Sequence, residues 1–350
     1  MKKLAILFLA FIMVIPLTAC GSDTNGTGDN GTLSVYVWTE YVPDSVIEKF
    51  EDETGIEVNV STFSSNEDML AKVKSESEGA FDIVQPSDYM VTQMADQGLL
   101  EEINHDKLTN LSNIDENYLD MDYDPGNIYS IPYQGGVAAI AVNTDKVTEE
   151  ITSYADLFKA EYKNSIVVLD DYRAVIGMTA RSLGYSMNET DQIKLAEIKD
   201  RLLKAKNNIK LYDSDSPKSA LIAGDCTIGF CWNAEIAMAM EENPNIEIVF
   251  PEEGPYVFMD NWTVPKGAKN YDNAMKFINF MLEPENAQLV MEEYPYINPN
   301  KVAVEAMGDE YSSNLAKNPP SETIAKGEYV GNLSPDVLKI YDQMWTELKK

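Results

Sequence analysis

Apolar and polar residues alternate along residues 33–38, which is the period-two pattern of a β-strand. Residues 43–54 predict a helix, which ends where Gly55 can supply a left-handed cap, and alternation returns at 56–60 as a second strand. Such a unit forms a parallel pair, whose ligands gather at the carboxyl ends of the strands. Residues 38–41 therefore lie where a ligand would bind. The alternative interpretation is that their aromatic residues belong to the core and that the glutamate is a solvated charge.

The order of strand, polar loop and helix recurs along the chain and predicts an α/β fold. The apolar strand at 81–84 is followed by the polar segment 86–89, and the strand at 165–169 is followed by 170–173. Residues 225–232 form a further predicted strand, which ends at a tryptophan.

A glycine pair at residues 135–136 leads into an apolar strand at 137–143, which predicts a crossing between two lobes. Residues 104–130 are polar and rich in turn formers, so they predict a surface loop. Further helices are predicted over 272–282, 284–293 and 335–348.

The amino terminus has the pattern of a secretory signal. Lys2 and Lys3 precede a short apolar run, and Leu-Thr-Ala-Cys ends at Cys20. This ending resembles the lipobox of bacterial lipoproteins, which implies cleavage after residue 19 and lipidation of Cys20. The alternative is an uncleaved anchor helix. Residues 21–32 contain no large apolar side chain and predict a flexible tether.

Charge narrows the possible partners. The 350 residues include 27 Lys and Arg against 58 Asp and Glu, a formal net charge of -31. Nucleic acid is excluded as a partner, because phosphate binding needs clustered basic residues, whereas cations are attracted. The single histidine, His105, and the absence of metal-ligand spacing argue against a metal site. Cys226 and Cys231 are predicted to be free, because five strand steps separate them.

The residues at the predicted strand ends are aromatic rings, carboxylates and hydroxyls. Carboxylates pair with ammonium groups, and aromatic faces attract cations and cover methylene chains. The combination suits an elongated organic cation. It also suits a secreted glycosidase, in which paired carboxylates act on a sugar held by aromatic rings.

Eight segments in order along the chain are similar to the spermidine/putrescine-binding lipoproteins of ABC importers. The segments are VWTEY (37–41), ETGIEV (53–58), STFSSNEDMLAKVK (61–74), FDIVQPSDYMV (81–91), YSIPYQGGVAAIAVN (129–143), WNAE (232–235), FMDNW (258–262) and YINPN (296–300). They extend through nearly all of the chain beyond the tether.

The resemblance implies a two-lobed periplasmic-binding-protein-like α/β fold with a hinge and a ligand cleft between the lobes. Lobe 1 is expected at 33–138 and 261–303, and lobe 2 at 139–260 and 304–350. The expected protein is a monomer without cofactor or catalysis, held by Cys20 on the extracellular face of the bacterial cytoplasmic membrane or in the periplasm. Its expected partners are a polyamine and the permease and ATPase subunits of an importer.

The resemblance also implies a set of ligand-binding residues. Glu40, Asp171 and Asp260 are expected to pair with ammonium groups, and Thr39 and Ser87 to accept hydrogen bonds from amines. The remaining residues are expected to surround the alkyl chain or complete the pocket: Trp38, Tyr41, Tyr89, Trp232, Glu235, Phe258 and Tyr296.

Departures from the family pattern leave the preferred polyamine open. Ala174 and Val330 stand where spermidine-preferring members have a glutamate and a glutamine, and Phe258 replaces a tryptophan. Glu235 and Phe258 match putrescine-preferring members, whereas the WTEY segment matches the spermidine type. The missing acceptors favour putrescine. A receptor for another cation, such as a thiamine-like amine, and a surface lipoprotein that only binds other proteins remain alternatives.

Overall fold

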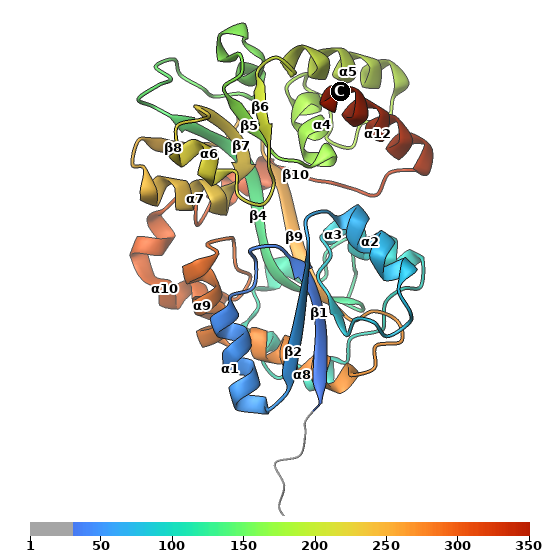
Figure 1. Cartoon of the computed structure of the whole chain (residues 1–350). Helices are drawn as coiled ribbons and strands as arrows, with labels where there is room; N and C mark the ends of the chain where they lie inside the picture. Colours follow the sequence, from blue (N-terminus) through green and yellow to red (C-terminus); the bar gives the residue numbers. More distant parts are fainter. Residues whose placement is uncertain (1–30) are drawn as a thin grey trace, which may run out of the picture.

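The computed structural model describes residues 31–350, so Cys20 and the predicted signal lie outside the described residues. Figure 1 shows two lobes, connected by the long antiparallel strands β4 (Ser130–Asn143) and β9 (Tyr256–Thr263). One continuous sheet runs through both lobes in the order β2-β1-β3-β9-β4-β7-β5-β6. The predicted two-lobed α/β fold is confirmed.

The first lobe begins with the predicted strand–helix–strand unit. β1 (Thr32–Trp38) pairs in parallel with β2 (Glu57–Phe63), and α1 (Asp44–Thr54) connects them. α1 ends at Gly55, whose φ of 68° is the left-handed conformation expected at this cap. Because β1 and β2 are parallel, the loops after Trp38 and after Phe63 lie at the same edge of the sheet.

The next helices follow strand ends in the same way. α2 (Asn66–Ser75) is capped by Ser65, whose side chain accepts a hydrogen bond from the Asp68 amide. β3 is limited to Ile83–Val84 and is followed by α3 (Asp88–Asp96). The predicted loop at 104–130 contains three 3-10 turns, η1 (His105–Lys107), η2 (Leu111–Asn113) and η3 (Glu116–Tyr118).

The two crossing strands are buried along their whole length. The prediction that β4 begins after the glycine pair is wrong, because β4 starts at Ser130 and includes both glycines. A Cβ atom on Gly136 would lie 2.9 Å from the Phe258 ring, so the glycine permits this ring to approach the neighbouring strand. The boundaries 138/139 and 260/261 fall inside β4 and β9 and stay predictions.

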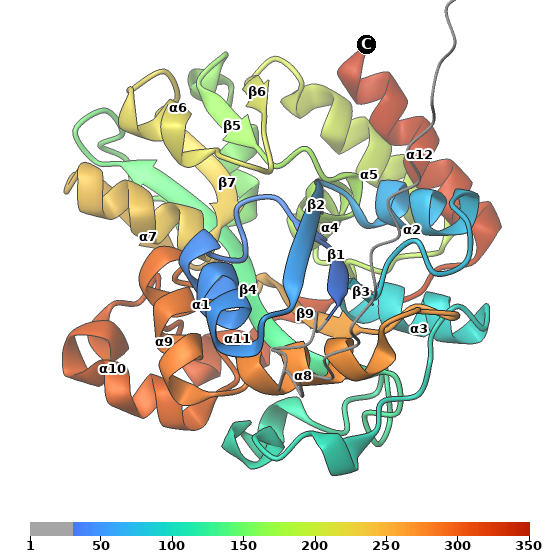
Figure 2. The ribbon, with the colours of Figure 1, turned by 60° about the horizontal axis from the view of Figure 1, so that its bottom comes forward.

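The second lobe has helices on both sides of β5 (Ile166–Val168), β6 (Ile209–Tyr212) and β7 (Ile228–Trp232). Figure 2 shows α6 and α7 on one side and α4, α5 and α12 on the other. The helices are α4 (Tyr172–Arg181), α5 (Gln192–Ala205), α6 (Lys218–Ile222), α7 (Asn233–Glu242) and α12 (Pro335–Lys349). β7 starts at Ile228, so the strand predicted from residue 225 is too long. Cys226 and Cys231 are buried free thiols, as predicted.

The predicted helices of the last third are present as α8 (Tyr271–Met281), α9 (Pro284–Glu293) and α12. Sequence reasoning missed α10 (Lys301–Ser313), which is broken at Gly308, and α11 (Ser321–Lys326). β8 (Ile246–Val249) pairs with β4, and β10 (Glu328–Tyr329) pairs with β9. Within residues 31–350, no helix is both long enough and apolar enough to cross a bilayer.

Candidate functional site

A small pocket of about 60 Å³ lies where the crossing strands meet the strand ends of both lobes. The first lobe contributes the segment after β1, the segment after β2 and the start of α3. The second lobe contributes the residues after β5, β6 and β7. The lining residues are Trp38, Thr39, Glu40, Tyr41, Ser64, Asn66, Ser87, Asp171, Ser214, Asp215, Trp232, Glu235, Tyr256, Phe258, Asp260 and Tyr296.

Asp260 on β9 is a pocket carboxylate with a side chain that two hydroxyl groups hold in place. Tyr41 Oη donates to Oδ2 at 2.7 Å, and Ser87 Oγ donates to Oδ1 at 2.5 Å. Asn66 in turn donates to Ser87 Oγ at 3.0 Å. Burial raises the pKa of Asp260 to about 7, although both hydroxyl groups oppose this shift by stabilising the charged form. A cation beside Asp260 would replace the solvation that burial removes.

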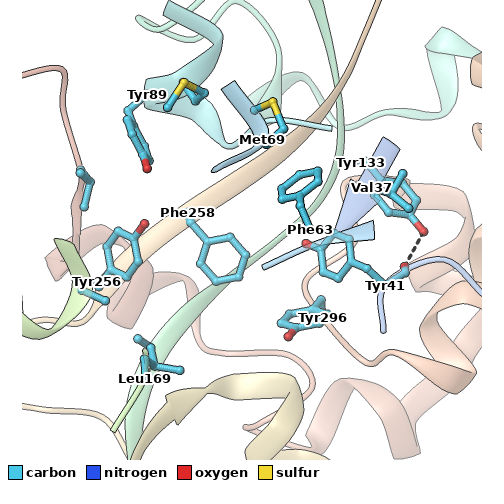
Figure 3. Close-up of a cluster of buried hydrophobic side chains, with 14 of the residues drawn as sticks. Val37, Tyr41, Phe63, Met69, Tyr89, Tyr133, Leu169, Tyr256, Phe258 and Tyr296 are labelled. Atoms are coloured by element: carbon cyan, nitrogen blue, oxygen red, sulfur yellow. Dashed lines mark hydrogen bonds between the residues drawn. The ribbon is translucent and has the colours of Figure 1, made fainter. Parts of the chain in front are cut away.

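Aromatic rings from both lobes line the same pocket as this carboxylate. Figure 3 shows Phe258 between Tyr256 and Tyr296. The Phe258 ring centroid lies 5.0 Å from that of Trp232 and 6.0 Å from that of Tyr296. Tyr41 packs edge-on against Tyr296 at 5.1 Å. These rings can cover methylene groups and present their faces to cations.

Asp171 contributes a carboxylate from the second lobe. It is the N-cap of α4, and its Oδ1 accepts a hydrogen bond of 2.9 Å from the Ala174 amide. Burial raises the pKa of Asp171, while this bond and nearby Arg173 oppose the shift. Because this side chain caps α4, its hydrogen bond to the helix holds the carboxylate in place at the pocket wall.

Glu40 and Glu235 line the pocket but already have a cationic partner. Lys218 Nζ donates to both oxygens of Glu235, at 2.9 and 3.1 Å, and to Glu40 Oε2 at 3.1 Å. The Glu235 side chain is 4% exposed, and burial raises its pKa to about 7 although Lys218 opposes the rise. Burial alone would lower the pKa of Lys218, but Glu235 and Glu40 outweigh it and raise this pKa.

The sequence and the fold of the chain are similar to those of known proteins. Residues 45–319 match the family model described as bacterial extracellular solute-binding protein. The chain belongs to this family. The spermidine/putrescine-binding periplasmic protein of Salmonella typhimurium is 40% identical over 332 residues, with 95% of each chain covered.

Solved structures give the same assignment for this solute-binding protein. The spermidine/putrescine ABC transporter substrate-binding protein PotD of Streptococcus pneumoniae has a TM-score of 0.78 and 36% identity, covering 91% of this chain and 98% of its own. The TpPotD lipoprotein of Treponema pallidum has a TM-score of 0.78 and 27% identity, covering 91% and 99%.

The pocket of this solute-binding protein contains most of the residues predicted as ligand-binding, and their role in binding stays a prediction. Tyr89 is the exception, because it does not line this pocket. Its hydroxyl donates to Glu67 at 3.0 Å, as does that of Tyr172 at 3.1 Å. The predicted residues that line the pocket are Trp38, Thr39, Glu40, Tyr41, Ser87, Asp171, Trp232, Glu235, Phe258, Asp260 and Tyr296.

Sequence reasoning missed five lining residues of this solute-binding protein, although signals for them exist. Tyr256 precedes Phe258 by two positions on one strand and therefore shares its face. Ser64 and Asn66 follow the end of β2, and Ser214 and Asp215 follow the end of β6. The carboxyl-end rule that identified the segment after β1 applies equally to these two loops.

The ligand-free solute-binding protein is expected to lose stability as pH rises from 5 to 8. Burial raises the pKa of Asp260 to about 7 and that of Asp88 to about 8, although hydrogen bonds from the Met259 and Tyr89 amides oppose the rise at Asp88. The folded state therefore binds more protons than the unfolded state in this range, so its free energy of unfolding falls by up to about 1.4 kcal/mol per pH unit and group. Urea unfolding at pH 5, 6, 7 and 8 measures this slope.

Asp88→Asn provides the matched control for this pH dependence. The amide resembles the protonated carboxyl and does not titrate, so the slope of stability against pH should flatten in the variant. A slope of zero in the wild type would contradict the raised pKa values of both aspartates. An unchanged slope in the variant would contradict the raised pKa of Asp88.

Proposed function

We propose that this protein binds a polyamine between its two lobes and delivers it to an ABC importer. The observation that carries the proposal is the Asp260 carboxylate, buried at the meeting point of both lobes and surrounded by aromatic rings. An ionised carboxylate that is removed from water needs a positive partner. The ammonium group of a polyamine supplies that charge, and its methylene chain suits the aromatic walls.

Two carboxylates support a linear dication as the ligand. Asp260 comes from β9 and Asp171 from the start of α4, so the two charges lie on different elements of the pocket. Two such carboxylates match the two ammonium groups of putrescine, the preference that the sequence also favours.

The transport role and location of this protein belong to the same proposal. A relative from Streptococcus pneumoniae is a substrate-binding protein of an ABC transporter, and one from Treponema pallidum is a lipoprotein. We therefore place this chain on the extracellular face of the membrane, as a monomer without catalytic activity that meets permease and ATPase subunits. Mass spectrometry of membrane-extracted protein tests the anchor, which requires a lipidated Cys20 as the first residue.

Thermal unfolding of the purified protein with putrescine, spermidine, spermine, choline and thiamine tests the function. A ligand that binds only the folded state stabilises it by about 2.7 kcal/mol at a hundredfold excess over its Kd. We expect a clear rise in Tm with a polyamine and none with choline or thiamine. A protein stripped of ligand whose Tm responds to no polyamine would refute the proposal, and a rise with thiamine alone would favour the alternative receptor.

A further inference from the structure

Lys218 is a cation at the edge of the pocket that binds residues of both lobes. It is the first residue of α6 in the second lobe and lies beside Glu235, which is in the first turn of α7. Its third acceptor, Glu40, follows β1 in the first lobe and has a positive φ of 51°. The Lys218 side chain is 18% exposed, whereas the Glu40 side chain is 47% exposed.

The Lys218 ammonium group contacts two carboxylates that line the pocket. Two of its three acceptor contacts are to Glu235, a carboxylate that is almost fully buried. Both Glu235 and Glu40 line the pocket, while Lys218 is not among the lining residues. A side chain of the protein therefore neutralises two carboxylates that a bound polycation would otherwise engage.

Five acidic residues line the pocket: Glu40, Asp171, Asp215, Glu235 and Asp260. Asp260 accepts hydrogen bonds from Tyr41 and Ser87, and Asp171 caps α4. Among the described residues, neither of these two carboxylates forms an ion pair with a lysine or arginine, whereas Glu40 and Glu235 share Lys218.

We propose that Lys218 determines specificity, because its ammonium group pairs with Glu40 and Glu235 and leaves Asp260 and Asp171 for a ligand with two charges. A third ligand ammonium would have to compete with Lys218 for the same carboxylates, or lie beside Asp215, which is exposed to solvent. The pocket therefore selects a diamine over a triamine. This inference rests on the proposed function, since it assumes that the ligand is a polyamine.

Lys218→Met tests the inference, because methionine retains an unbranched stem and removes the charge. We expect the ratio of spermidine to putrescine affinity, measured by titration calorimetry, to rise at least tenfold, as a ligand ammonium takes the place of Lys218. Lys218→Gln removes the charge but keeps a hydrogen-bond donor for Glu235, so it gives the same shift if the methionine variant fails to fold. In Lys218→Met/Glu235→Gln the buried carboxylate is also absent, and the ratio should return toward that of the wild type.

Lys210→Met is the matched control, because Lys210 pairs with the exposed Asp225 outside the pocket. Lys210→Met changes the net charge by the same amount as Lys218→Met. It should leave the ratio of spermidine to putrescine affinity unchanged. Equal loss of affinity for both polyamines in Lys218→Met and Lys218→Gln, or an unchanged ratio, would overturn the inference while the proposed function stands. A wild-type protein that binds neither polyamine would overturn the proposed function and the inference with it.

Discussion

Replacing Asp260 by asparagine is expected to weaken polyamine binding by about 2 to 5 kcal/mol, or roughly 30-fold to several thousand-fold. The wild-type carboxylate accepts hydrogen bonds from Tyr41 and Ser87 and still has lone pairs for a ligand ammonium. The asparagine amide has no charge to offset that of the buried ammonium group. Titration calorimetry at pH 8, where Asp260 is largely ionised, measures the loss.

Asp88→Asn is the matched control for Asp260→Asn. Asp88 is 2% exposed and Asp260 is 4% exposed, but Asp88 does not line the pocket. Its pKa of about 8 leaves it about half ionised at pH 8, so Asp88→Asn also removes a buried negative charge, but one that backbone N–H groups of Tyr89 and Met259 hold outside the pocket. The control should change affinity far less than Asp260→Asn. If the two variants lost affinity to a similar extent, removal of any buried acid near the pocket would weaken binding. The loss in Asp260→Asn would then not report a contact between Asp260 and the ligand.

The sequence predicted helices and strands correctly where apolar residues recurred with a clear period and a cap or turn residue marked the end of the element. The alternation at 33–38 and the cap at Gly55 correspond to β1 and to the end of α1. The missed helix α10 has few large apolar residues and is broken at Gly308, so its pattern is weak. The start of β4 at Ser130 was missed because the strand is fixed by pairing with β9, which is distant in sequence.

Residue types predicted the composition of the pocket but not its internal pairing. Glu40, Asp171 and Asp260 were expected to act alike, yet the structure gives them different partners. Glu40 shares Lys218 with Glu235, although 178 positions separate Glu40 from Lys218. No local pattern marks such a contact, because only the packing of β1, α6 and α7 brings these charges together. Tyr89 was included by resemblance, but its hydroxyl is bound to Glu67.

Asp171→Asn should weaken polyamine binding by about 2 to 5 kcal/mol while leaving the second lobe intact. Asparagine is as good an N-cap as aspartate, so its side chain can still accept the hydrogen bond from the Ala174 amide at the start of α4. The substitution removes the charge that would face a ligand ammonium and keeps the helix cap. Calorimetry gives the loss of affinity, and urea unfolding of the ligand-free variant gives the stability.

Asp171→Ala separates the two roles of this residue. Alanine removes both the charge and the cap, and loss of an N-cap costs about 0.5 to 2 kcal/mol of stability. If Asp171 pairs with the ligand, both variants lose affinity to a similar extent and only Asp171→Ala is clearly less stable. If its role is only to hold α4 in place, Asp171→Asn binds like the wild type and Asp171→Ala alone is impaired. The pair of variants therefore decides whether the second lobe contributes a charge to the ligand or only a rigid wall to the pocket.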